Sequence, residues 1–196
     1  MRTFSIIVLR FFVSAGIFAQ EADVNLLKES EVGLYNLYEQ LYLLQEDDLK
    51  RQLNDSILTT FEYVLCSYES FEYSFDSLQR IGRKYSPDKK FRIITWNLPW
   101  QDGTHTYFGF IQRPVKKENR CEIIHLTDRS HEIEDPAKTE LTAGNWFGVL
   151  YYDILLNRYK GKNYYTLLGF DFNDRFSTKK VMDALNWLGL TSKINS

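Results

Sequence analysis

A short segment between two apolar runs gathers the side chains best suited to bind a ligand. Trp96 and Trp100 lie four residues apart, and Asp102 and His105 follow them. Aromatic rings beside amide, carboxylate and imidazole groups are typical of surfaces that hold sugars or peptides. His105 could also act as an acid or base with Asp102, because its charge changes near neutral pH. These four residues are the predicted ligand site; the alternative is that Trp96 lies in the core and Trp100 covers the end of a sheet.

Catalytic motifs are missing from the sequence. It contains no G-x-S-x-G elbow, phosphate-binding P-loop, H-E-x-x-H helix or G-x-G-x-x-G fingerprint. Asp102, Asp153 and Asp171 are the candidates for a carboxylate-dependent hydrolase acting on glycans. That mechanism requires two of them to lie about 5–10 Å apart in a cleft. The catalytic residues therefore stay unassigned, and no cofactor is predicted.

One polar segment contains oxygen ligands of the kind that bind Ca²⁺. Asp171, Asn173 and Asp174 stand at its start, but Phe176 and Met182 occupy the positions where an EF-hand has Gly and Glu. The favoured interpretation is a turn at the end of a strand, so no metal site is predicted.

The two cysteines, Cys66 and Cys121, could form a disulfide outside the cytoplasm or remain separate buried thiols. Closing a loop of about 55 residues would stabilise the fold by about 4 kcal/mol on the chain-entropy model. Cys121 with His125 and His131 matches no closed structural zinc site.

The composition indicates one globular domain. Of 196 residues, 44% are apolar and 16% aromatic, which is enough for a sizeable core and favours sheet. The formal charge is −2 and no extended basic stripe is present, so a nucleic-acid partner is not expected.

Residues 1–19 are predicted to be a secretory signal peptide. Arg2 provides a positive start, Phe11–Phe18 forms a short apolar stretch, and Ala19 is a small residue suited to cleavage. The stretch is too short to span a membrane well, and no lipid-anchoring cysteine follows it. The mature protein, starting at Gln20, is expected to be secreted or periplasmic without a transmembrane anchor. The alternative is a buried N-terminal strand or helix.

Two helices are predicted before residue 68. Leucines recur at helical spacing from Asp23 to Gln45, and a second stripe follows the acidic cluster Glu46–Asp48. Carboxylates favour a helix N-terminus, so this cluster is expected to start the second helix of an αα-hairpin.

From residue 71 to 188 the sequence favours strands. A hairpin is centred on Pro99 to Gly103, and a period-two aromatic segment at 71–75 reads as an edge strand or as an extended segment lying across the core. A polar connection is expected at 113–120. The predicted strands are Leu78–Tyr85, Phe91–Trp96, Thr104–Gln112, Cys121–Thr127, Trp146–Leu156 and Tyr164–Phe170.

The last segment, Ser177–Leu188, is ambiguous. A helix carrying Val181, Leu185 and Leu188 is slightly favoured over a strand at Lys180–Leu185. Short connections favour antiparallel pairing. The predicted fold is α+β, a single domain over residues 20–196 in which an N-terminal helical hairpin packs on an antiparallel β-meander of about six or seven strands.

Three segments together carry a family resemblance: SPDKKFRIITWNLPWQDGTHTYFGFIQ, WFGVLYYDI, and YYTLLGFD with the following Lys179-Lys180-Val181. They resemble an uncharacterised family of secreted bacterial proteins, over about Phe71 to Leu185. The resemblance implies an exported, strand-rich bacterial protein and transfers no activity. In such relatives the Lys-Lys-Val stretch is expected to enter another strand and a Phe-Gly-containing end, from which this chain departs after Leu185.

The function that these observations favour is a non-enzymatic binding or interaction domain outside the cytoplasm. Its partner would be a glycan, a peptide or an envelope protein. The alternatives are the carboxylate-dependent hydrolase and a structural envelope component, for which an exposed sheet edge would be the sign.

Overall fold

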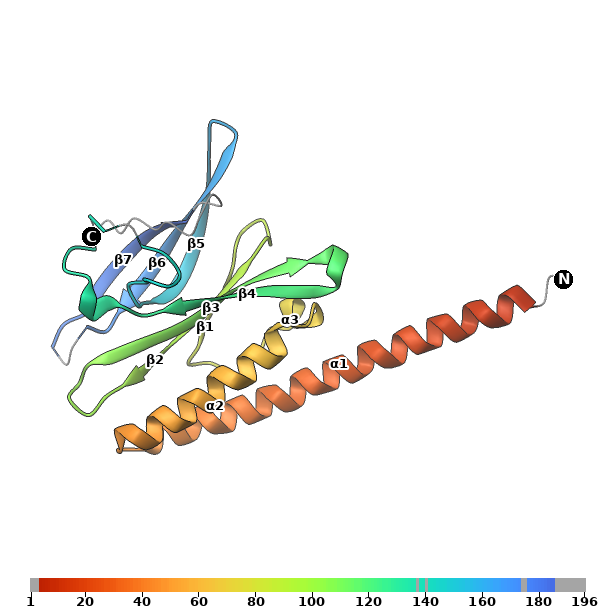
Figure 1. Cartoon of the computed structure of the whole chain (residues 1–196), viewed down its shortest axis with the longest axis horizontal. Coiled ribbons are helices and arrows are strands. Elements are labelled where there is room, and N and C mark those ends of the chain that lie inside the picture. The colour runs from red at the N-terminus through yellow and green to blue at the C-terminus, as the bar shows by residue number, and fades with distance from the viewer. Residues whose placement is uncertain (1–3, 137, 140, 174–175, 186–196) are drawn as a thin grey trace.

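The computed structural model describes residues 4–136, 138–139, 141–173 and 176–185, with side chains from residue 23 onward. The fold is α+β with three layers: a helix pair, a four-stranded sheet and a three-stranded sheet (Figure 1). The helices are α1 (Phe4–Leu43), α2 (Asp47–Leu65) and the short α3 (Glu69–Glu72). The first sheet has the order β1 (Gly82–Tyr85), β2 (Arg92–Pro99), β3 (His105–Val115), β4 (Arg120–Thr127). The second has the order β5 (Leu150–Tyr159), β6 (Lys162–Asp171), β7 (Lys179–Leu185).

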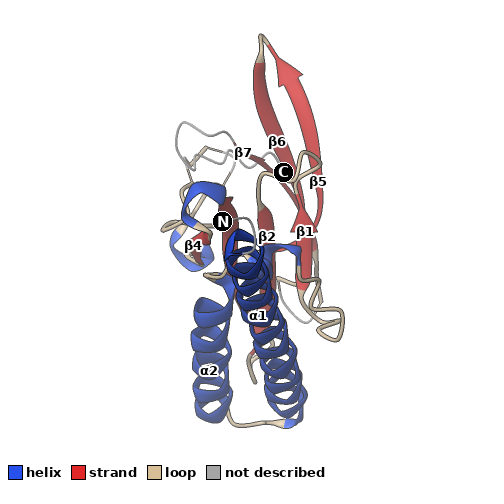
Figure 2. Ribbon diagram, turned by 90° about the vertical axis from the view of Figure 1, so that its right-hand side faces the viewer, coloured by secondary structure: helices blue, strands red, loops and turns tan. Residues whose placement is uncertain are grey.

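The helical hairpin is as predicted. Figure 2 shows α1 and α2 side by side, and Asp47 and Asp48 start α2. Their buried apolar residues, at helical spacing, include Leu27, Leu34 and Leu41 on α1 and Ile57, Phe61 and Val64 on α2. Residues 4–19 of the segment predicted as a signal peptide lie in the N-terminal part of α1. Among the residues that the structure describes, no helix has the length and apolarity needed to cross a bilayer.

The central strand β2 is buried on both faces, so it belongs to two cores. Ile94, Trp96 and Leu98 pack against the helices. Ile93, one position along, packs instead among residues of the second sheet. Successive side chains of a strand point to opposite faces, so this alternation makes the first sheet the middle layer.

The seven strands form two antiparallel meanders rather than one. The helix favoured for Ser177–Leu188 is wrong as far as Leu185, because Lys179–Leu185 is strand β7; the rest of that segment lies outside the described residues. β7 pairs with β6, and it buries Val181, Asp183 and Leu185 at a period of two. The ladder with β6 supplies hydrogen bonds that favour the strand.

Two smaller corrections concern segments near the first sheet. Residues 71–75 do not form a strand: the helix α3 ends at Glu72, and Phe71 and Phe75 are buried beside the sheet. The predicted polar connection at 113–120 is shorter than expected, because β3 continues to Val115 and a 3-10 turn, η1 (Lys116–Glu118), leads into β4.

Candidate functional site

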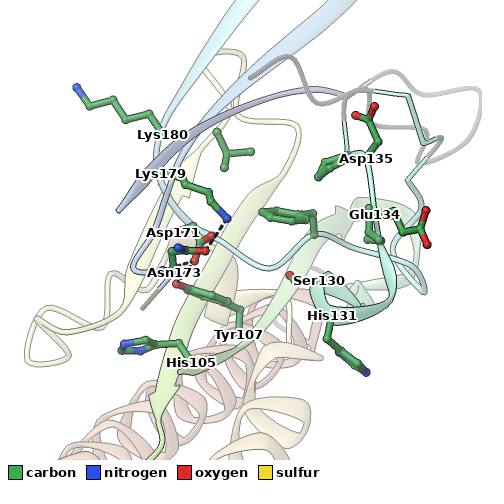
Figure 3. A pocket seen from close by; sticks show the side chains of 14 residues that line it. His105, Tyr107, Ser130, His131, Glu134, Asp135, Asp171, Asn173, Lys179 and Lys180 are labelled. Carbon is green, nitrogen blue, oxygen red and sulfur yellow. Dashed lines mark hydrogen bonds between the residues drawn. The ribbon is translucent and has the colours of Figure 1, made fainter. Parts of the chain in front are cut away.

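A pocket of about 660 Å³ opens at one end of the space between the two sheets (Figure 3). Its walls come from the start of β3, the end of β6, the start of β7 and the segment after β4, which contains the 3-10 turn η2 (Ser130–Glu132). The apolar lining residues are Ile133, Pro136, Phe147 and Val181, and the polar or aromatic ones used below are His105, Tyr107, Ser130, Asp171, Asn173 and Lys179.

The polar corner of the pocket is built around Tyr107 and Asp171. The Tyr107 hydroxyl donates to Asp171 Oδ1 at 2.8 Å and accepts from the backbone N–H of Phe172 at 2.7 Å. Burial, reinforced by the Asp171 carboxylate, raises the pKa of Tyr107 far above its ordinary value, so the phenol stays protonated. Tyr107 therefore acts as a fixed donor that orients the carboxylate.

Asn173 and Lys179 extend this corner. Asn173 has a left-handed backbone, φ 50°, and its N–H donates to Asp171 Oδ1 at 2.7 Å. This Asx-type turn is the predicted strand-ending turn. Lys179 Nζ donates to Asn173 Oδ1 at 2.5 Å, and Figure 3 shows its side chain pointing toward Asp171 while Lys180 points away. The corner thus combines one ammonium group with one carboxylate.

The opposite wall is held by the half-buried carboxylate of Asp128. Asp128 Oδ2 accepts the backbone N–H of Tyr107 at 2.8 Å, and its Oδ1 accepts both the N–H and the hydroxyl of Ser130, at 2.9 and 2.5 Å. Ser130 Oγ in turn accepts the Gly148 N–H at 2.8 Å. A Cβ atom at position 148 would lie 2.5 Å from the Asp128 carboxylate, so only glycine fits there. The wall is therefore fixed to β3 without a ligand.

His105 stands at the rim as a neutral ring. Its Nδ1 lies 2.8 Å from the Asn97 amide nitrogen, and since an amide nitrogen donates, Nδ1 accepts and the proton is on Nε2. Partial burial lowers the pKa of His105, and the charges of Asp171 and Asp102 oppose that shift. The ring also stacks on Phe172, with centroids 5.1 Å apart.

Of the four predicted ligand residues, only His105 lines this pocket. Trp96 is 1% exposed, and its Nε1–H donates to Asn54 of α2 at 2.8 Å, so it belongs to the core. Trp100 donates to Thr106 Oγ1 at 2.8 Å and packs on the helix-facing core, with the guanidinium of Arg51 over its ring. The alternative stated for both tryptophans fits the geometry better than ligand binding does.

The three candidate catalytic carboxylates lie in different places. Asp102 Oδ1 accepts from the backbone and hydroxyl of Thr104 in the β2–β3 turn, at 2.8 and 2.7 Å. Asp153 lies on β5, away from the pocket lining, and accepts the N–H of Ile154. Asp171 alone lines the pocket. No pair of them flanks the cavity as a glycosidase requires.

The described residues considered as Ca²⁺ ligands make hydrogen bonds within the protein instead. Asp171 and Asn173 hydrogen-bond within the polar corner, and Asp174 lies outside the described residues. Within the described part of the chain, no three His, Cys, Asp or Glu side chains are grouped so that they could hold a metal ion.

The sequence did not predict that Tyr107, Ser130 and Lys179 line one pocket. Tyr107 lies 64 residues from Asp171, and no local spacing brings them together. The one available signal is the alternation of β3, which places His105 and Tyr107 on the same face.

Comparison of the chain with protein-family models, curated protein sequences and solved structures gives no match. The chemistry of the pocket is therefore the basis for a functional conclusion.

Proposed function

We propose that this protein is an exported, non-enzymatic domain that binds a hydroxyl-rich ligand, such as a glycan fragment, in the pocket between its two sheets. The observation that carries the proposal is the polar corner of Asp171 and Lys179 set against apolar walls. Pockets of several hundred cubic ångströms with few oriented polar groups are typical ligand sites.

The corner presents both an acceptor and donors. Both hydrogen bonds to Asp171 end on Oδ1, and Oδ2 accepts none from the described residues. Lys179 and the Nε2–H of His105 are donors. A sugar hydroxyl donates and accepts at once, so it can pair with a carboxylate oxygen and an ammonium group together, while its C–H face packs on apolar walls.

The hydrogen bonding of the wall supports binding rather than catalysis. The carboxylate beside the Ser130 hydroxyl, Asp128, already accepts backbone N–H groups on both oxygens, and the Ser130 oxygen itself accepts the Gly148 N–H, so both groups serve the wall. The Tyr107 hydroxyl is engaged in the same way by Asp171 and Phe172. These bonds fix the walls before a ligand arrives, which reduces the ordering cost of binding.

Export is part of the same proposal. Its support is the N-terminal sequence, with Arg2, the apolar stretch Phe11–Phe18 and Ala19. Expression in a bacterial host followed by N-terminal sequencing tests it. A mature start at Gln20 is expected, and recovery of the intact N-terminus from the cytoplasm would contradict export.

A thermal-shift screen of the protein against neutral and acidic oligosaccharides, with peptides and divalent metals as comparisons, tests the binding function. A ligand at about 100 times its Kd stabilises the fold by about 2.7 kcal/mol. Ile133→Trp should fill the pocket and abolish the shift, whereas Leu155→Trp, on the outer face of β5, should retain it. A shift that survives Ile133→Trp would place the site elsewhere, and chromatographic detection of cleaved oligosaccharide would favour the hydrolase.

A further inference from the structure

The two cysteines are far apart in the sequence but adjacent in the fold, where the helix pair packs against the first sheet. Cys66 is the C-cap residue that follows α2, and Cys121 lies in the edge strand β4. The Cys121 N–H donates to the Cys66 carbonyl at 2.8 Å, and the next residues, Ser67 and Arg120, form an antiparallel bridge. The two cysteines are therefore direct cross-chain partners.

Their backbone relation satisfies the geometric condition for a disulfide. Cys66 caps α2 in an αR conformation, and the single hydrogen bond from the Cys121 N–H to its carbonyl holds the two backbones close enough for the Cα separation of about 4.4–6.8 Å seen in disulfides. Both sulfurs are thiols in this structure, and the Cys66 thiol donates to the Glu62 carbonyl at 3.1 Å. Closure requires the exposed Cys66 side chain to leave the Glu62 carbonyl and turn toward Cys121.

The two thiols differ in access. Cys66 is exposed, so a small disulfide can reach it, while Cys121 is buried and can be reached by Cys66 from within the fold. Burial raises the pKa of the Cys121 thiol to about 11, and the buried Arg92 opposes that rise. Cys66 is therefore the entry point for exchange.

We propose that Cys66 and Cys121 form an intramolecular disulfide that attaches α2 to the edge strand β4. The oxidant is a small-molecule disulfide such as oxidised glutathione. The Cys66 thiolate attacks it, forming a mixed disulfide and releasing one glutathione thiolate. The Cys121 thiol loses its proton to solvent and attacks the Cys66 sulfur, forming the protein disulfide and releasing the second glutathione. Two cysteine thiols are oxidised and one glutathione disulfide is reduced to two thiols.

The bond would close a loop of about 55 residues that includes α3 and strands β1 to β3. A loop of that length is expected to raise the midpoint of thermal unfolding by about 10 °C. It would also attach β4, an edge strand of the first sheet, covalently at the end nearest α2. The inference is independent of the ligand proposed for the pocket.

The test equilibrates the full-length chain in glutathione buffers from fully reduced to fully oxidised, quenches it with acid and alkylates the free thiols. Peptide mapping should show a monomer with a Cys66–Cys121 cross-link, and the oxidised form should unfold about 10 °C higher in a scan that dithiothreitol reverses. Cys66→Ser, at an exposed position, should fold normally and show neither change.

Four outcomes would overturn the proposal. They are two free thiols at every redox ratio, a glutathione adduct that persists on Cys66, disulfide-linked dimers, and a cross-link that leaves the unfolding midpoint unchanged. Cys121→Ala provides a second check, since its Cys66 should then stop at the glutathione adduct.

Discussion

The two sides of the first sheet, one packed on the helices and one on the second sheet, differ in the buried charged group that each encloses. Facing the helices, Arg92 is fully buried, and its guanidinium donates to the Ser70 and Tyr73 carbonyls at 2.8 and 2.6 Å and to Gln112 Oε1 at 2.6 Å. On the other side, Asp183 of β7 in the second sheet is equally buried, but its Oδ1 has no hydrogen-bond partner. Among the described residues, the helix side leaves the neutral Tyr38 hydroxyl without a partner, whereas the inter-sheet side leaves one oxygen of an ionisable carboxylate without a partner.

Packing follows the same division. On the helix-facing side, Phe61 of α2 contacts both Trp96 and Phe110, with centroids 5.3 and 6.2 Å apart. On the other side, Tyr151 donates to Asp183 and accepts from Trp146 Nε1 at 2.9 Å, and the inter-sheet space ends in the pocket. The helix side therefore encloses a cation whose guanidinium is hydrogen-bonded, while the inter-sheet side encloses a carboxylate with one oxygen unpaired.

The largest expected effect is at Arg92. Arg92→Met would leave the Ser70 and Tyr73 carbonyls and Gln112 without their buried donor, so we expect a loss of about 4 kcal/mol in the free energy of unfolding. Urea unfolding measures it. Arg113→Met, which removes a half-exposed partner of Glu122, is the matched control and should cost less than about 1 kcal/mol. Equal losses in the two variants would remove the distinction between the faces.

The next largest loss of stability is expected for Phe61→Ala. It removes a ring that is 1% exposed and that joins α2 to the sheet, so a loss of about 3–4 kcal/mol is expected. Tyr63→Ala, on the exposed side of the same helix, is the control and should stay within about 0.5 kcal/mol. A small loss at Phe61 would mean that the helix pair contributes little to the sheet.

Asp183→Asn tests the unpaired carboxylate of the inter-sheet side and should increase the free energy of unfolding. Burial raises the pKa of Asp183 to about 6, partly offset by the hydrogen bond from Tyr151. The folded pKa of Asp183 exceeds the unfolded one, so the protonated carboxyl is compatible with folding and the ionised one opposes it. The free energy of unfolding is therefore highest below about pH 4 and decreases as the pH rises through about 6. The loss is about 3 kcal/mol, at about 1.4 kcal/mol per unit.

The amide cannot ionise, so the variant should exceed the native protein in unfolding free energy by about 2–3 kcal/mol at pH 8 and match it at pH 4. Paired denaturation curves at both pH values measure the difference. Asp153→Asn, an exposed carboxylate on β5, is the control and should show no such gap. A constant difference across pH would show that Asp183 does not titrate in this range.

The fold was largely predictable because its signals are local. The stripe containing Ile57, Phe61 and Val64 has helical spacing, and the turn at Asp102-Gly103 separates two apolar runs. Strand β7 was not predictable in this way, because Val181 and Leu185 are four residues apart, a spacing that suits a helix as well as a strand. Pairing with β6, which is a tertiary contact, decides between them.

The candidate site was less predictable because it depends on three distant segments. His105 and Asp171 were identified separately, but Tyr107, which connects Asp171 to Asp128, had no motif to mark it. Trp96 had the chemistry of a binding residue and the position of a core residue, and sequence alone does not separate those two uses.

Tyr107→Phe should reduce stability less than the substitutions above, but it should weaken ligand binding. It removes the hydroxyl that orients Asp171, leaving that carboxylate one donor fewer, so we expect a loss of about 1–2 kcal/mol in unfolding free energy. Affinity for an oligosaccharide found in the screen should fall about tenfold by calorimetry. Tyr85→Phe, which removes a hydroxyl on the helix-facing side, is the matched control and should leave affinity unchanged. Equal affinity in both variants would remove Tyr107 and Asp171 from the site.

The smallest effect is expected at Leu155, on the outer face of the second sheet. Leu155 is 45% exposed, whereas its neighbour Ile154 is 4% exposed and points into the inter-sheet core. Leu155→Ser should therefore change the free energy of unfolding by less than about 0.5 kcal/mol, and Ile154→Ser should cost about 3 kcal/mol, because the two side chains occupy opposite faces of one strand. Urea denaturation of both variants makes the comparison within a single element. If Leu155→Ser proved as costly as Ile154→Ser, the outer face would be covered in solution, and the second sheet would be as fully buried as the first.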